Sequence, residues 1–201
     1  MIAILDYDAG NIKSVEKALQ GLGEQPVITR ERTEILQADK VILPGVGAFG
    51  DAMEKIRSYG LEEIIHEVAA QGKPFMGICL GLQLLFEGSE EAPGVKGLGI
   101  LAGEIVKFPQ MEDLKIPHIG WNSLHFQNDG RLFRGLPQDT YVYFVHSYYL
   151  KAREESIVKA AAEYGVVFHA AVEQENVFGC QFHPEKSSDA GIRMLQNFVE
   201  L

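Results

Sequence analysis

The sequence has few cysteines, a shortage of basic residues and no long apolar run, and each shortage excludes a class of protein. Its 201 residues include two cysteines, Cys79 and Cys180, too few for a disulfide framework, which favours a reduced, cytoplasmic setting. Lysine and arginine total 18 against 28 acidic residues, giving a formal charge of −10, so nucleic acid and anionic membranes are not expected partners. No apolar stretch approaches the roughly 18 residues that a membrane span requires.

Short apolar runs alternate with segments of helical periodicity in the first half of the chain. The expected strands are the apolar runs at 2–5, 26–29, 40–43 and 73–78. The expected helices are the segments at 11–22, 51–58, 61–71 and 80–87. Asn11 is expected to cap the first of them. Strands that are apolar along their whole length are buried on both faces, so the pattern predicts an α/β fold with a mostly parallel central sheet flanked by helices.

The second half of the chain changes character, with several short strands and little helix. The expected strands lie at 100–108, 141–145, 157–162, 166–172 and 177–183, and a final helix at 187–200. Strands joined by short turns favour antiparallel additions to the same sheet. No repeat, linker or low-complexity tract interrupts the pattern, so we expect residues 1–201 to form a single domain.

The stretch Gly77-Ile78-Cys79-Leu80-Gly81 lies between an expected strand and an expected helix. At such a junction G-x-C-x-G is the cysteine form of the nucleophile elbow, a turn that strains its central residue and requires small neighbours. The start of the following helix favours a thiolate, and the next backbone N–H can face an oxyanion. The alternative interpretation is a buried structural cysteine with incidental glycines.

A histidine and a glutamate near the C-terminus, His183 and Glu185, are candidates to activate this thiol. Strand alternation places Gln181, His183 and Glu185 on one face, with Pro184 holding the segment extended. Cys180 falls on the opposite face and is expected in the core. A lone His-x-Glu also suits a surface ion pair or half of a metal site. The other histidines show no metal-ligand spacing, so no metal is expected.

A glycine-rich loop at 43–50 follows the third expected strand and contains Gly45, Gly47 and Gly50. G-x-G-x-x-G suggests a dinucleotide site, but that motif normally follows the first strand and is completed by an acidic residue about 20 positions on, which is missing here. The other interpretation is a loop whose backbone N–H groups face a substrate carboxylate or an oxyanion. No cofactor is expected.

Together these motifs resemble the class I (triad) glutamine amidotransferase family. The loop at 44–47, the elbow at 77–81 and the segment Phe182-His183-Pro184-Glu185 occur in the family's order, and the resemblance covers essentially the whole chain. It implies a flavodoxin-like fold, in which a mostly parallel central sheet is flanked by helices and extended by antiparallel strands. It also implies hydrolysis of glutamine to glutamate and ammonia.

For the reaction itself the resemblance implies a Cys-His-Glu triad. Cys79 would attack the glutamine carboxamide and form a thioester with release of ammonia. His183 would carry the thiol proton to the leaving nitrogen, and Glu185 would hold the imidazole. No departure from the family pattern is seen at these three positions.

The resemblance also assigns residues to the oxyanion hole and to substrate binding. The oxyanion hole would comprise the backbone N–H of Leu80 with that of Val46 or Gly47. The substrate contacts would come from Gly45, Gln83, Glu91, His146 and Ser147. Glu91 suits the substrate ammonium, whereas Gln83 has the plainer alternative of a solvated helix position.

In this family the released ammonia passes to a synthase subunit, and the branch that this chain resembles most uses a (βα)₈-barrel cyclase. The resemblance therefore implies a heterodimer in which the partner stimulates a feeble glutaminase. The candidate interface residues are Asn11, His118, Trp121 and Lys186. Tryptophan is a frequent interface anchor, although Trp121 has an alternative position in the core.

Three other functions stay open. One is a glutaminase for a different synthase, such as that of anthranilate or pyridoxal phosphate. A second is a non-catalytic binding module of the same fold, and a third is a cysteine peptidase or thioesterase built on the same elbow. Assays of glutamine, ester and peptide hydrolysis separate these functions.

Overall fold

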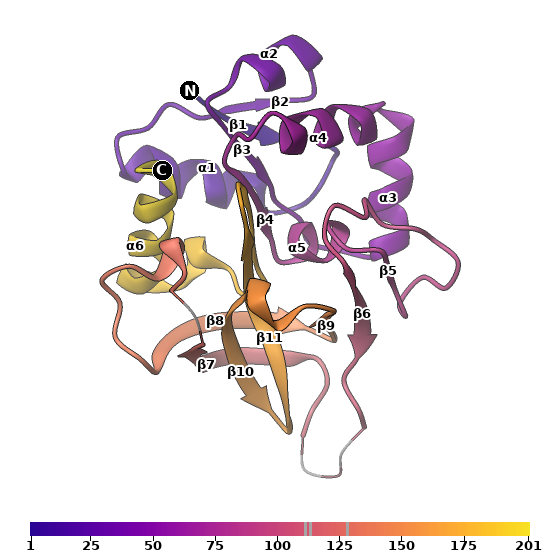
Figure 1. The fold of residues 1–201 in the computed structure, drawn as a ribbon, viewed down its shortest axis with the longest axis vertical. Helices are drawn as coiled ribbons and strands as arrows, with labels where there is room; N and C mark the ends of the chain where they lie inside the picture. The colour runs from indigo at the N-terminus through magenta and orange to yellow at the C-terminus, as the bar shows by residue number, and fades with distance from the viewer. Residues whose placement is uncertain (111, 113, 128) are drawn as a thin grey trace.

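The computed structural model describes residues 1–110, 112, 114–127 and 129–201 (Figure 1). Its α-helices are α1 (Ile12–Gly21), α2 (Arg32–Gln37), α3 (Phe49–Ser58), α4 (Leu61–Ala70), α5 (Leu80–Leu84) and α6 (Ser188–Val199). Its strands are β1 (Ile2–Leu5), β2 (Val27–Thr29), β3 (Lys40–Leu43), β4 (Phe75–Ile78), β5 (Gly88–Ser89), β6 (Gly103–Lys107), β7 (His118–Phe126), β8 (Thr140–His146), β9 (Tyr148–Ala152), β10 (Val158–Tyr164), β11 (Val166–Gln174) and β12 (Val177–Cys180). No helix of the described residues is long and apolar enough to cross a membrane.

One sheet contains all of these strands. Its main path runs β2-β1-β3-β4-β12-β11-β10-β7-β8, and a side branch leads from β11 through β9 and β6 to β5. Neighbours are parallel from β2 to β12 and antiparallel from β12 to β8. The predicted α/β fold, with a parallel centre and antiparallel additions, is confirmed.

The parallel strands are apolar throughout because helices cover both faces of the sheet. Along β1, Ala3 and Leu5 point into one core cluster, and Ile2 and Ile4 point into the other. The first cluster includes residues of α2, α3, α4 and α5, and the second includes residues of α1 and α6 (Figure 1). The parallel strands β3, β4 and β12 are therefore buried up to their carboxyl ends, where the candidate site lies.

Four elements are missing from the sequence prediction: the two-residue strand β5 and three elements with weak periodicity. Helix α2 has six residues and one buried side chain, Ile35. Strand β7 mixes polar residues with Gly120, whose φ is +133°. Strand β9 is five residues long and lies in the side branch of the sheet. The helix expected at 80–87 ends earlier, at Leu84.

Candidate active site

Cys79 lies at the turn between β4 and α5. Its backbone has φ 54° and ψ −108°, a positive φ that is strained for a residue with a side chain. A Cβ on Gly77 would lie 2.6 Å from the Gly81 backbone, and a Cβ on Gly81 would lie 1.9 Å from the Leu43 carbonyl oxygen. Close backbone approach therefore requires both glycines that flank the cysteine, as the elbow motif predicts.

The two cysteines have different surroundings. Cys79 lines a pocket, whereas Cys180 is 1 % exposed and burial raises the pKa of its thiol well above the ordinary value. The expected core position of Cys180 is confirmed.

The backbone N–H of Cys79 donates to the Cys180 carbonyl at 2.8 Å, where β4 pairs with β12. The elbow therefore lies beside the segment that follows β12.

His183 and Glu185 lie in that segment and pair with each other. His183 Nδ1 and Glu185 Oε1 are 2.7 Å apart, and neither side chain is more than 1 % exposed. The prediction of an extended segment is wrong, because β12 ends at Cys180 and Pro184–Lys186 forms a 3₁₀ turn that begins with proline. This turn, rather than strand alternation, brings the carboxylate to the imidazole.

The imidazole of His183 is poised for proton transfer. Burial alone lowers the pKa of His183, but Cys79 and Glu185 together outweigh it and raise this pKa to about 9. Glu185 engages Nδ1, while the buried Nε2 has no hydrogen-bond partner among the described residues. An unpaired buried ring nitrogen destabilises a fold, and such groups are concentrated at functional sites.

Asn11 contacts the same histidine–glutamate pair. Asn11 occupies the N-cap position of α1, as predicted, but its side chain makes no capping hydrogen bond. Its Nδ2 donates instead to Glu185 Oε1 at 2.5 Å and lies 3.5 Å from His183 Nδ1. The half-buried Asn11 side chain is therefore engaged with the histidine–glutamate pair, and its place at an interface stays a prediction.

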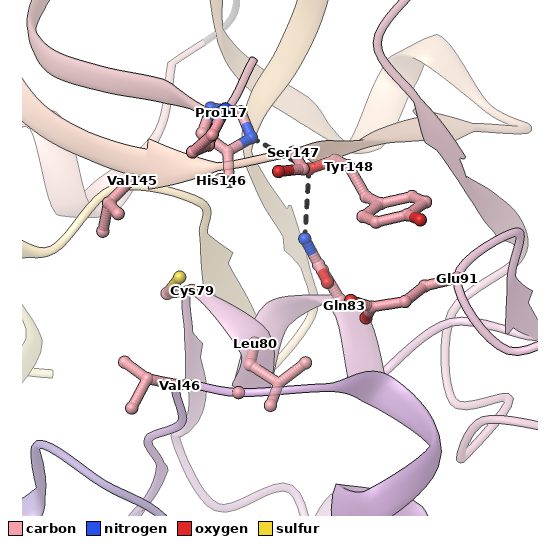
Figure 2. Close-up of a pocket in the computed structure, with 11 residues that line it drawn as sticks. Val46, Cys79, Leu80, Gln83, Glu91, Pro117, Val145, His146, Ser147 and Tyr148 are labelled. Atoms are coloured by element: carbon pink, nitrogen blue, oxygen red, sulfur yellow. Dashed lines mark hydrogen bonds between the residues drawn. The ribbon is translucent and has the colours of Figure 1, made fainter.

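A pocket of about 300 Å³ opens beside Cys79 (Figure 2). Its lining residues are Val46, Gly47, Cys79, Leu80, Gln83, Glu91, Pro117, Val145, His146, Ser147 and Tyr148. Gly45 is not part of this lining and lies behind it, where a Cβ would meet the Tyr7 hydroxyl at 2.2 Å. The volume suits a small molecule. In the described part of the chain, no cluster of histidine, cysteine and carboxylate side chains is placed to hold a metal ion.

The groups expected to form an oxyanion hole lie along this pocket, but they are not both free. The Leu80 backbone N–H donates to the Gly45 carbonyl at 3.3 Å, so the loop after β3 occupies it. Gly47 has φ +114°, and a Cβ there would meet nothing within 4 Å. Val46 is 37 % exposed. The loop therefore has space to change conformation around Gly47.

Gln83 and Glu91 form one wall of the pocket (Figure 2). Gln83 is 5 % exposed, so the alternative of a solvated helix position is wrong. Its Nε2 donates to the Tyr148 carbonyl at 3.1 Å and to Gln181 Oε1 at 3.0 Å. The Glu91 carboxylate accepts the Phe49 backbone N–H at 2.9 Å. It supplies a negative charge in a fixed position.

His146, which lines the pocket, forms a buried pair with His118. His146 Nδ1 lies 2.8 Å from the Tyr148 carbonyl, and its Nε2 lies 3.0 Å from His118 Nδ1. Because a carbonyl only accepts, His146 Nδ1 carries the proton and Nε2 accepts from His118. Burial lowers the pKa of His146 to about 3 and that of His118 to about 4. His118 is 3 % exposed, so the expectation that it lies at an interface is wrong.

Trp121 and Lys186 are exposed. Trp121 is 52 % exposed, so the alternative of a core position is wrong. It shares the outward face of the β7–β8 pair with Ile119 and Tyr141, each 60 % exposed. Val145 pairs with Ile119 across the strands and lines the pocket. This apolar surface, the β7–β8 face (Ile119, Trp121 and Tyr141), therefore extends to the pocket mouth.

Two side chains at the site were not assigned a role by the sequence. Gln181 Nε2 donates to Cys79 Sγ at 3.7 Å, and the Tyr7 hydroxyl donates to the Pro44 carbonyl at 2.7 Å. Burial, helped by the nearby Cys79 thiol, raises the pKa of Tyr7. The alternation that groups Gln181 with the histidine is a usable signal for Gln181. The sequence contains no comparable signal for Tyr7, because a single buried tyrosine has the same sequence pattern as any core residue.

Comparison with known proteins defines the class to which this chain belongs. The model of the family described as Glutamine amidotransferase class-I matches residues 3–201, and the chain belongs to this family. Imidazole glycerol phosphate synthase subunit HisH of Moorella thermoacetica is 52 % identical over 200 residues, covering 100 % of this chain and 94 % of the relative. The subunit of the same name from Methanocaldococcus jannaschii is 48 % identical over 201 residues, covering 100 % of both. The structure of PurLQS from Thermotoga maritima matches the fold with a TM-score of 0.77 at 21 % identity, over 99 % of this chain and 97 % of that one.

Proposed function

We propose that this chain is the glutaminase subunit of imidazole glycerol phosphate synthase, acting in histidine biosynthesis. The observation that carries the proposal is the Cys79 thiol on a strained elbow, beside the buried His183–Glu185 pair and on the wall of a small pocket. Relatives that bear this subunit's name are about half identical over the full length, which favours this synthase over those of anthranilate or pyridoxal phosphate.

Acylation begins when the Cys79 sulfur attacks the carboxamide carbon of glutamine. His183 takes the thiol proton, and the carbonyl electrons move onto oxygen to give a tetrahedral intermediate. His183 then delivers the proton to the amide nitrogen, the C–N bond breaks and ammonia leaves. Glu185 holds the imidazole and stabilises its charged form, and a thioester remains on the sulfur.

Deacylation uses the same groups in the reverse sense. Neutral His183 takes a proton from water as the water attacks the thioester carbon, and the C–S bond then breaks to release glutamate. The oxyanion of each step accepts the N–H of Leu80 and one from the 46–47 peptide. Because the Leu80 N–H donates to Gly45, the loop after β3 must rearrange to complete the hole. A partner that favours the rearranged loop raises the rate.

The ammonia is consumed by a (βα)₈-barrel cyclase partner in a heterodimer. The products are imidazole glycerol phosphate and aminoimidazole-carboxamide ribotide. The β7–β8 face supports docking at the pocket mouth, because it exposes an aromatic and aliphatic surface next to the pocket-lining Val145. Lys186, exposed beside Glu185, adds a cation to this rim. A partner seated there also keeps ammonia from escaping into water.

The test combines the purified chain with a candidate cyclase subunit and the formimino-linked aminoimidazole-carboxamide ribonucleotide. Glutamate and imidazole glycerol phosphate are expected in equal amounts, with glutamine hydrolysis at least about 10²-fold faster than in the chain alone. The control replaces glutamine with ammonium salts and uses the Cys79→Ser variant. Hydrolysis of esters or peptides without any hydrolysis of glutamine would contradict the proposal and favour a thioesterase or peptidase.

A further inference from the structure

The sulfur of Cys79 accepts a hydrogen bond from a buried amide that the reaction scheme above does not use. Gln181 Nε2 lies 3.7 Å from Cys79 Sγ, a distance compatible with hydrogen bonding to sulfur. Gln181 directly follows β12 and is 0 % exposed, so bulk water does not compete for this donor. A hydrogen bond to a charged acceptor is about twice as strong as one to a neutral acceptor. The donor therefore stabilises a thiolate more than a thiol.

The orientation of the Gln181 amide follows from its partners. The Tyr148 carbonyl can only accept, so Gln83 must direct its NH₂ group toward Tyr148. The same NH₂ group also donates to Gln181, which must present Oε1 to Gln83 at 3.0 Å. Gln181 is then left with its NH₂ group toward Cys79 Sγ. A fixed backbone carbonyl thus determines, through two side-chain amides, which atom faces the sulfur.

The carbonyl that anchors this arrangement is itself held in place. Tyr148 accepts the Nδ1–H of His146, and His146 in turn accepts a hydrogen bond from His118. Both histidines are buried, and burial keeps them neutral at pH 7. The hydrogen-bond chain therefore runs without a break from β7 through β8, β9 and α5 to Gln181 and the sulfur, and every donor direction in it is determined.

We propose that Gln181 is a further catalytic residue of the glutaminase reaction, whose amide N–H stabilises the Cys79 thiolate while Gln83 orients that amide. The proposal rests on the proposed function, in which Cys79 is the nucleophile. The thiolate is the attacking form in acylation and the leaving form in deacylation, so one donor serves both steps.

The test measures the thiolate directly and needs no glutamine. Iodoacetamide alkylation of Cys79 is followed across pH 5–10 in wild type and in Gln181→Met, which keeps the side-chain volume and removes the donor. The midpoint of the rate–pH profile is expected to rise by about one pH unit, with alkylation at pH 7 about 5- to 10-fold slower. Peptide mapping by mass spectrometry assigns the label to Cys79 or Cys180.

Neighbouring ionisable groups are the same in the two proteins. Those that interact electrostatically with the thiol are His183, Tyr7 and Cys180, from the segment after β12, the segment after β1 and β12 itself. Glu185 acts on the thiol through His183. A shift in the midpoint therefore reports the lost amide donor.

Two further variants keep the result interpretable. Gln174→Met makes the same chemical change on the neighbouring β11, and its profile should match wild type. Gln83→Met frees the Gln181 amide to rotate, so it should give a smaller upward shift even where Gln181→Met fails to fold. An unchanged midpoint in folded Gln181→Met overturns the inference, as does an unchanged midpoint in Gln83→Met where Gln181→Met is unfolded. A shifted midpoint in a chain that hydrolyses no glutamine with its partner supports the sulfur contact while rejecting the proposed function.

Discussion

The elbow after β4 and the loop after β3 meet at the same pocket, but packing constrains them very differently. At the elbow, a Cβ on Gly81 would lie 1.9 Å from the Leu43 carbonyl oxygen, and Cys79 is 6 % exposed. In the loop, a Cβ on Gly47 would meet nothing within 4 Å, and Val46 is 37 % exposed. We infer that packing fixes the nucleophile, while the loop that must complete the oxyanion hole is free to rearrange.

The largest expected effect comes from the rigid side of this comparison. Cys79→Ser should lower glutamine hydrolysis by at least about 10³-fold, because a serine hydroxyl is far less acidic than a thiol and forms no comparable nucleophile beside His183. Synthesis from ammonium salts by the complex should survive. Glutamate release by the variant at close to the wild-type rate would contradict the assignment of Cys79 as the nucleophile.

A methyl group added at the elbow should mainly affect folding. Gly81→Ala places a Cβ against the Leu43 carbonyl. Neither the Cβ nor the carbonyl can move away without a shift of the backbone, so we expect a loss of at least about 3 kcal/mol in the free energy of unfolding. Urea denaturation measures it. A near-neutral result would show that the elbow can move and would remove the contrast with the loop.

A methyl group added in the loop should mainly affect activity. The added Cβ of Gly47→Ala meets no atom, but alanine lacks the wide φ range that lets glycine change conformation, so the loop rotation that completes the oxyanion hole should be harder to make. The partner-stimulated glutaminase rate should fall by about 10²-fold, and the basal rate should fall much less. Gly23→Ala is the matched control, since Gly23 also has a positive φ and open space but lies at the end of α1. Equal losses in both rates would count against a regulated loop.

The buried pair of His118 and His146 should make the fold less stable in acid. Burial lowers the pKa of His146 to about 3 and that of His118 to about 4, below the ordinary value of 6.5, so their contribution to stability is full above pH 6.5 and is lost as pH falls toward 4. Between pH 6.5 and 4, each histidine should lower the free energy of unfolding by roughly 1.4 kcal/mol for each pH unit that the pH falls. His118→Gln should reduce this slope, whereas the exposed His66→Gln should leave it unchanged. Denaturant unfolding at pH 6.5, 5.5 and 4.5 tests this.

The smallest expected effect concerns the base of the loop. Tyr7→Phe removes the hydrogen bond to the Pro44 carbonyl and should lower the free energy of unfolding by about 1 kcal/mol. Because this bond tethers the loop where it leaves β3, the basal glutaminase rate should change along with stability. A loss of stability with no change in the basal glutaminase rate would show that this hydrogen bond does not restrain the part of the loop that rearranges, which would then lie entirely beyond Pro44.

The sequence predicts the parallel half of the fold well, for a physical reason. Strands such as Ile2–Leu5 and Lys40–Leu43 are buried on both faces, so their apolar runs stand out. Strand β7 does not stand out, because one face is solvated and Gly120 interrupts the alternation. The short α2 buries one side chain and leaves little pattern.

The candidate active site is likewise only partly predictable from the sequence. Cys79, with its two glycines, is predictable because the strain of the elbow is local in sequence. The geometry of the histidine–glutamate pair is not, since Pro184 begins a 3₁₀ turn where an extended segment is expected. The contacts of Gln181 with Gln83 and Cys79 join residues about 100 positions apart, and only the folded chain brings them together.

The most direct test of the account is covalent labelling with a glutamine analogue that carries an electrophilic carbon. The chain is incubated with the analogue alone and with the cyclase subunit, and the labelled peptide is identified by mass spectrometry. We expect modification of Cys79 and none of the buried Cys180, with faster labelling in the presence of the partner. Labelling of Cys180, or none under either condition, would contradict it.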